Sequence, residues 1–235
     1  MRRVLLVAAL AAAAVAVFAG PAGATNECRG LQVCIRVPGP WVVVPTARTV
    51  PRPLAEFELS CPQGAVAAGL DAELSVQSLD VNWLAMLGAP VNPGVSTNRS
   101  VLFYGRYVGA SAAAPTFRPH LGCVPTQGGG VRVPTSAARV YPPGHPTTRR
   151  VKTVRIQPGR TTVAQACKPG ETLVDTTHAV GFYTASPPGA DLVGAVSVSE
   201  RISGNRVALT ARAGAAIAGV RTVVQVGALC AGATA

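Results

Sequence analysis

Apolar and polar residues alternate along much of the C-terminal half of the chain. Val207, Leu209 and Ala211 share one phase, whereas the other phase holds two arginines and a threonine. A second alternation, rich in valine and threonine, runs through residues 220–230. A period of two with this composition is typical of β-strands that have one apolar and one polar face. We therefore expect strands in both segments.

The segment Leu70–Gln77 fits either a strand or a helix. Its alternation is clean, but Leu70, Leu74 and Gln77 also suit one face of a helix. The corresponding stretch of the C-terminal half, Thr172–Val180, is rich in β-branched residues, which are poor helix formers. Homologous halves share a fold, so we expect strands in both.

Proline and glycine punctuate these alternating segments. Pro93-Gly94 and Pro187-Pro188-Gly189 mark turns between short strands. Short strands joined by such turns predict an all-β fold of duplicated, antiparallel, β-sandwich-like repeats. The pattern leaves open whether the repeats form one shared sandwich or two separate domains.

Two stretches of similar length are framed by cysteines. They are Cys61–Cys123 and Cys167–Cys230, whose ends are 62 and 63 residues apart. Each opens with a cysteine followed three residues later by glycine. Each also holds an Asn-Arg pair 25 and 24 residues before its closing cysteine, Asn98-Arg99 and Asn205-Arg206. These correspondences predict a duplication of about 65 residues plus a leading strand.

The six cysteines predict three disulfides, because an even count in an oxidising compartment is typical of cross-linked proteins. If each repeat closes its own loop, the pairs are Cys28–Cys34, Cys61–Cys123 and Cys167–Cys230. The alternative is a swapped frame, in which cysteines of one repeat pair with those of the other. Large side chains are scarce, with two Trp, five Phe and four Tyr. Closing a loop of this size contributes roughly 4 kcal/mol in the entropy model, so the cross-links weigh heavily in such a fold.

The first 24 residues have the order of a secretory signal peptide. A short positive start, Met1-Arg2-Arg3, precedes the apolar run Val4–Ala19, and Ala22-Gly23-Ala24 provides a small-residue cleavage site. The apolar run is shorter than the roughly 20 residues needed to span a bilayer. We expect cleavage after Ala24, no transmembrane segment thereafter, and a secreted, extracellular product.

The mature chain divides into three parts on composition. Residues 25–125 hold an N-terminal segment and repeat one, residues 126–148 form a Gly/Pro-rich linker, and residues 149–235 hold repeat two. Leading strands are expected at Trp41–Val44 for repeat one and around Val151–Ile156 for repeat two. The excess of arginine over lysine indicates a GC-rich, bacterial genome.

The mature chain is basic, with an expected net charge of about +9 once the two arginines of the leader are removed. Five basic residues fall within 12 positions: Arg149, Arg150, Lys152, Arg155 and Arg160. Such a cluster indicates contact with a cell-wall or other extracellular anionic polymer. The alternative is a merely solvated strand face. Specific nucleic-acid binding is not favoured. Proteins that bind single strands stack bases on several aromatic side chains, and Tyr141 is the aromatic residue near this cluster.

No catalytic, metal or cofactor signature emerges from the sequence. There is no Gly-x-Ser-x-Gly elbow, and the cysteines are assigned to disulfides. The spacing of Cys28 and Cys34 lacks a histidine pair at zinc-finger distance. The other groups with chemistry to offer are three histidines and an acidic cluster: His120, His145, His178, Asp71, Glu73 and Asp80.

These features favour a non-catalytic β module, secreted or associated with the cell envelope, that binds a glycan or an anionic surface. One alternative is a secreted protease inhibitor presenting a proline-bounded loop, Ala89–Ser96 or Ala185–Gly189. Another is a secreted hydrolase with no recognisable motif.

Overall fold

The structure is a computed structural model and describes residues 25–47, 53–84, 99–110, 114–126 and 147–232. The described chain is mostly antiparallel β-sheet, with one short helix, α2 (Ala190–Gly194), and a 3-10 turn, η1 (Ala215–Ile217). The prediction of an all-β, disulfide-stabilised fold is therefore confirmed. The leader, most of the linker and the loop Ala89–Ser96 lie outside the described residues.

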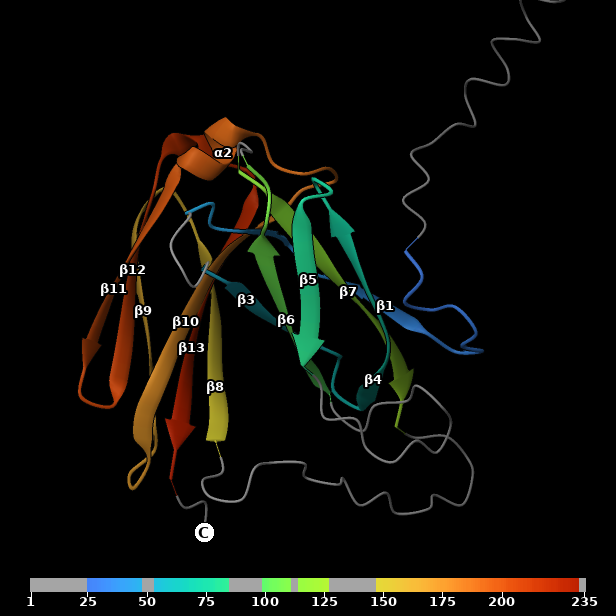
Figure 1. Cartoon of the computed structure of the whole chain (residues 1–235), viewed down its shortest axis with the longest axis horizontal. Helices are drawn as coiled ribbons and strands as arrows, with labels where there is room; N and C mark the ends of the chain where they lie inside the picture. Colours follow the sequence, from blue (N-terminus) through green and yellow to red (C-terminus); the bar gives the residue numbers. More distant parts are fainter. Residues whose placement is uncertain (1–24, 48–52, 85–98, 111–113, 127–146, 233–235) are drawn as a thin grey trace, which may run out of the picture.

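The first half of the molecule (residues 35–125) contributes strands to two sheets (Figure 1). A three-stranded sheet has the order β3-β6-β5, with β3 at Ala55–Ser60, β6 at Ser100–Tyr107 and β5 at Leu79–Leu84. The remaining strands are β1 (Ile35–Pro38), β2 (Trp41–Val43), β4 (Ala65–Leu74) and β7 (Thr116–Pro125). β7 pairs with β4, β1 and β2.

The second half (residues 147–231) is built in the same order. Its three-stranded sheet is β9-β12-β11, with β9 at Gly159–Ala166, β12 at Arg206–Ala213 and β11 at Val196–Ser203. The remaining strands are β8 (Thr147–Ile156), β10 (Thr172–Tyr183) and β13 (Arg221–Ala231). β13 pairs with β10 and β8, as β7 does with β4 and β1. β8 begins at Thr147, so its first two residues belong to the segment 126–148 that was predicted as linker.

Local details of the two halves also correspond. Ala67 pairs with Cys123 and Leu173 with Cys230, and in each half the register shifts directly after that pair. Such a shift marks a β-bulge, which bends the strand and raises its twist. The turn after each opening cysteine ends at a glycine, Gly64 in the first half and Gly170 in the second. Both glycines have a positive φ, a backbone conformation that residues with a side chain rarely adopt.

Three disulfides cross-link the described residues: Cys28–Cys34, Cys61–Cys123 and Cys167–Cys230. These are the pairs expected if each half closes its own loop. The two long-range bonds link the strand before each opening turn to the closing strand of the same half. Their closing cysteines are buried in the two hydrophobic clusters described below.

β2 joins the two halves. Val42 pairs with Phe117 of β7 on one side and with Gly181 of β10 on the other, so one seven-stranded sheet runs through both halves. The segment Trp41–Val44 was expected to match the leading strand of the second half. The strand that occupies the position of β8 is instead β1, because β1 pairs with β7 as β8 pairs with β13.

The buried core consists of two clusters, one in each half. In the first, Val101 and Phe103 of β6 pack with Phe117 and Leu121 of β7. In the second, the predicted apolar phase of β12 packs against β13; its members include Val207, Leu209, Ala211, Val224, Val226 and Ala228. The first cluster also contains Ala179 and Val223 from the second half, so the two cores meet at the junction.

None of the helices in the described ranges is long and apolar enough to cross a membrane.

Candidate anion-binding face

Two of the five clustered basic residues are engaged in ion pairs. Arg149 Nη1 lies 2.6 Å from a carboxylate oxygen of Glu56 on β3 and donates a hydrogen bond to the Thr177 hydroxyl. Arg150 donates two hydrogen bonds to the carboxylate of Glu171, which is buried. These two guanidinium groups therefore serve the fold and are not free for a ligand.

The Arg150–Glu171 pair fixes the turn that follows Cys167. The hydrogen bonds from Arg150, followed by the backbone N–H of Lys168, hold the pKa of the Glu171 carboxyl below its usual range. In return, Glu171 raises the pKa of Arg150. Bidentate geometry of this kind is among the stronger polar contacts in proteins.

Lys152 and Arg155 are exposed on β8, which is an edge strand of the seven-stranded sheet. An exposed edge offers unpaired backbone groups to other chains, and charged residues on it oppose such pairing. Their position explains two of the clustered charges without a ligand.

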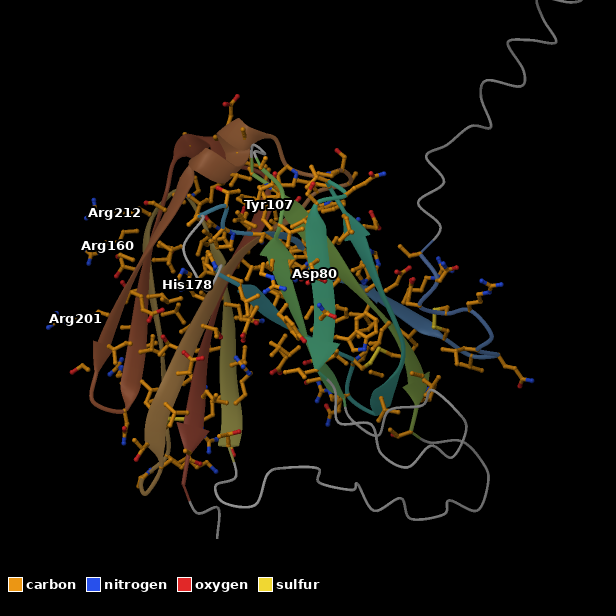
Figure 2. All side chains as sticks on the ribbon, in the orientation of Figure 1. Asp80, Tyr107, Arg160, His178, Arg201 and Arg212 are labelled. Atoms are coloured by element: carbon orange, nitrogen blue, oxygen red, sulfur yellow. A yellow bond between two sulfur atoms is a disulfide. The ribbon has the colours of Figure 1, made fainter. Side chains whose placement is uncertain are left out.

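Arg160 lies apart from the other four, on β9 in the three-stranded sheet of the second half. Strand register places it directly opposite Arg212 of β12, and Arg212 opposite Ser197 of β11. The buried residues of β12 lie in the other phase, so these side chains face away from the core. Figure 2 shows Arg160, Arg201 and Arg212 extending outward from this side of the molecule.

We call the outward side of this sheet the arginine face. Its residues alternate with the buried phase and are Ser197, Ser199, Arg201, Ser203, Arg206, Ala208, Thr210, Arg212, Arg160, Thr162, Ala164 and Ala166. The face thus combines four arginines with small and hydroxyl residues, and it includes neither a carboxylate nor an aromatic ring. All four arginines are exposed, and none forms an ion pair with another described residue.

A shallow hollow lies at one end of the arginine face. Its volume is about 620 Å³. It is wide open to solvent and lined by Gly159, Arg160, Ala195, Ser197, Arg212, Ala213 and Gly214. Like charges directly opposite each other on a sheet are destabilising, so the Arg160–Arg212 pair weakens the fold unless an anion neutralises it.

The corresponding sheet of the first half differs in charge. Arg106 occupies the penultimate position of β6, as Arg212 does in the equally long β12. Arg106 pairs across the strands with Asp80, and its Nη2 lies 3.2 Å from the carboxylate. In the second half, Ser197 stands across from Arg212 where the first half has an acid. Asp80 thus neutralises Arg106 in the first half, whereas no described carboxylate pairs with Arg212 in the second.

Two described histidines pair with carboxylates. His178 Nδ1 lies 3.1 Å from Glu200, and the Thr176 hydroxyl donates to the other oxygen of the same carboxylate. The hydroxyl is thus directed to the acid, and this trio links β10 to β11. His120 Nε2 lies 2.8 Å from Glu73 but outside hydrogen-bond alignment. In neither arrangement does a hydroxyl or thiol lie against a histidine nitrogen, which is the order of groups in a catalytic triad. His145 lies outside the described residues.

One cluster of potential metal ligands occurs in the described chain: Cys167, Glu171 and Cys230. The two cysteines form a disulfide, which leaves no thiolate to bind a metal, and Arg150 occupies the carboxylate. The cluster is therefore a structural cross-link.

The described inhibitor-loop candidate is Ala185–Gly189. Pro188 is buried, which ties the loop to the molecule, and the Thr184 hydroxyl donates a local hydrogen bond to the carbonyl of Ser186. The other candidate, Ala89–Ser96, lies outside the described residues.

The sequence pointed to Arg160 but not to its partners. Arg201, Arg206 and Arg212 lie about 40 to 50 positions away, and only strand register brings them to one face with Arg160. The available signal was the alternation around Leu209, which already placed Arg206 and Arg212 on a polar phase.

Comparison with known proteins gives no relative: no family model, no curated protein and no solved structure matches the chain.

Proposed function

We propose that the chain is an exported, non-catalytic module of two β-sandwich-like repeats that binds an anionic polymer of the cell envelope through its arginine face. The observation that carries the proposal is the contrast between equivalent sheets. Arg106 is neutralised by Asp80, whereas Arg160, Arg201, Arg206 and Arg212 have no ion-pair partner among the described residues.

Duplication explains how such a contrast arises. The two halves share strand order, bulge position and opening turn, so a single ancestral unit accounts for both. After duplication, one copy is free to lose its acid and gain arginines while the other keeps the fold. The signal-peptide pattern and the three disulfides support export to an oxidising compartment.

The proposal is tested by co-sedimentation of the mature protein with an insoluble cell-wall preparation, followed by release in a salt gradient. We expect the wild type to sediment at low salt and to elute as salt screens the charges. The R160Q/R212Q variant should remain largely in the supernatant. Its matched control is K152Q/R155Q, which removes the same charge from the edge strand β8 and should sediment like the wild type.

Equal loss of binding in the two double variants would mean that net charge alone drives retention, and would refute a defined face. Retention of the wild type that resists high salt would also contradict the proposal, because arginine contacts with a polyanion are screened.

A further inference from the structure

The hollow at the end of the arginine face has the elements of a site for one anionic group. Arg160 and Arg212 are direct cross-strand partners, so their Cβ atoms are separated by roughly 5 Å and both guanidinium groups can reach the same ligand. Ser197 adds a hydroxyl next to Arg212. The site is thus assembled from all three strands of the sheet.

Four of the seven residues that line the hollow are glycine or alanine. Gly159, Ala195, Ala213 and Gly214 line it. A Cβ added at Gly159 would meet nothing within 4 Å, and at Gly214 the nearest atoms lie 3.7 Å away. A bulky group attached to the anion therefore has room beside the two arginines.

The pair of arginines selects the kind of anion. A carboxylate offers two oxygens in one plane, so it binds one guanidinium fork side by side and a second only through its outer lone pairs. A phosphate monoester carries up to two charges and three acceptor oxygens, so it can accept hydrogen bonds from two forks at once. A sulfate ester shares the tetrahedral arrangement of oxygens. The hollow therefore fits a phosphate or sulfate ester better than a uronic acid.

A second basic group lies farther along the same face. Arg206 is six residues from Arg212 on β12, a separation of roughly 20 Å in an extended strand. Arg201 lies between them on β11, opposite Ala208. The intervening positions of the face are short side chains, so a chain lying along β12 would pass without obstruction.

We propose, on the basis of the proposed function, that the arginine face binds a linear glycan polymer bearing phosphate or sulfate esters. One ester occupies the hollow between Arg160 and Arg212, and the polymer runs along β12 to Arg201 and Arg206. A single-stranded nucleic acid fits less well, because its bases stack on aromatic rings and this face has none.

The experiment measures affinity as a function of ligand length by calorimetry. The probes are a monosaccharide phosphate, a monosaccharide sulfate, and phosphorylated and sulfated oligosaccharides of increasing length. Binding should tighten at least tenfold once the oligosaccharide spans roughly 20 Å, because the second contact becomes intramolecular. The series that shows this step, phosphorylated or sulfated, identifies which ester the face recognises.

Two variants separate the two ends of the face. R160Q/R212Q should weaken every probe at least tenfold, including the monosaccharides. R201Q/R206Q should leave the monosaccharides unchanged and abolish the gain from length. Circular dichroism and non-reducing gels check that each variant keeps its fold and disulfides.

A smooth rise of affinity with charge, without a step, would overturn the inference and leave only a diffuse basic surface. Equal effects of the two variants on monosaccharides would overturn it as well. A single-stranded oligodeoxynucleotide of matched length that binds as tightly as the oligosaccharides would show that the glycan assignment is wrong. If wild-type protein binds none of these probes and no cell wall, the proposed function itself fails.

Discussion

Carboxylates in this protein have opposite fates according to their partners. Glu171 meets a guanidinium fork and a backbone N–H, so its charged form is favoured. Glu58 on β3 is partly buried at the junction of the halves, and burial raises its pKa more than Ser100 and Arg149 lower it. An ionised glutamate therefore stabilises the turn at Glu171, whereas an ionised glutamate at position 58 destabilises the junction of the two halves.

The Glu58→Gln variant should be more stable than the wild type at pH 7. The folded-state pKa of Glu58 is raised. The contribution of Glu58 to the free energy of unfolding is therefore fully present below about pH 4.5 and is lost as pH rises through the folded-state pKa. The amide carries no charge to desolvate. Thermal unfolding from pH 4 to 8 should show a stability gain that grows toward neutral pH. A variant that loses stability at pH 7 would contradict this reasoning.

Among the elements, β3 shows how an edge strand can be closed by a side chain. The N–H of Glu58 donates to the amide oxygen of Gln225 on β13, and the amide nitrogen of Gln225 donates back to the Glu58 carbonyl. The Gln225 amide also donates to the Thr153 hydroxyl. The side chain thus imitates a paired strand and connects the two halves.

Gln225→Leu should destabilise the protein by about 1–3 kcal/mol, because it leaves the donor and the acceptor of Glu58 without a partner at a buried position. Urea denaturation measures the difference. Gln157→Leu, at an exposed site in the turn between β8 and β9, is the control and should change stability by less than about 0.5 kcal/mol. Equal effects of the two substitutions would disprove the role of Gln225.

Sequence patterns predicted the strands better than they predicted which residues of the two halves correspond. Counting back from the closing cysteines matched Asn98-Arg99 with Asn205-Arg206. In the structure, the N–H of Cys61 bonds the carbonyl of Arg99, and the N–H of Cys167 bonds that of Asn205. Arg99 therefore corresponds to Asn205, one position from the sequence match. The additional residue of the second half lies after β12, so counting back from the closing cysteine shifts the match by one position. Counting forward from the opening cysteine gives the structural match, because Arg99 and Asn205 both lie 38 residues after it.

The same limit applies to the candidate site. A window along the chain collected Arg149 to Arg160, but hydrogen-bonding partners as distant as Glu56 and Glu171 decide which of these charges stay free. Pairing across strands is a long-range property, so it follows from tertiary structure and not from local composition.

At the scale of the whole molecule, one seven-stranded sheet runs through both halves, and each half adds a three-stranded sheet. The two three-stranded sheets differ in the charges they carry. The sheet of the first half carries Asp80 and Arg106 as a pair, whereas that of the second half presents outward four arginines that have no ion-pair partner within the part of the chain that the structure describes. A cross-linked β framework suits such a surface, because strand pairing fixes the backbone positions of the arginines before the ligand arrives and so reduces the entropy lost on binding.

The measurement that tests this account most directly is the salt dependence of affinity for a long phosphorylated or sulfated oligosaccharide. Each arginine that contacts the polyanion displaces counterions, so removing that arginine makes the slope of log K against log salt concentration shallower. We predict that R160Q/R212Q makes this slope shallower than that of the wild type, and that K152Q/R155Q leaves it unchanged. An equal loss of slope in both variants, or none in R160Q/R212Q, would contradict binding at the arginine face.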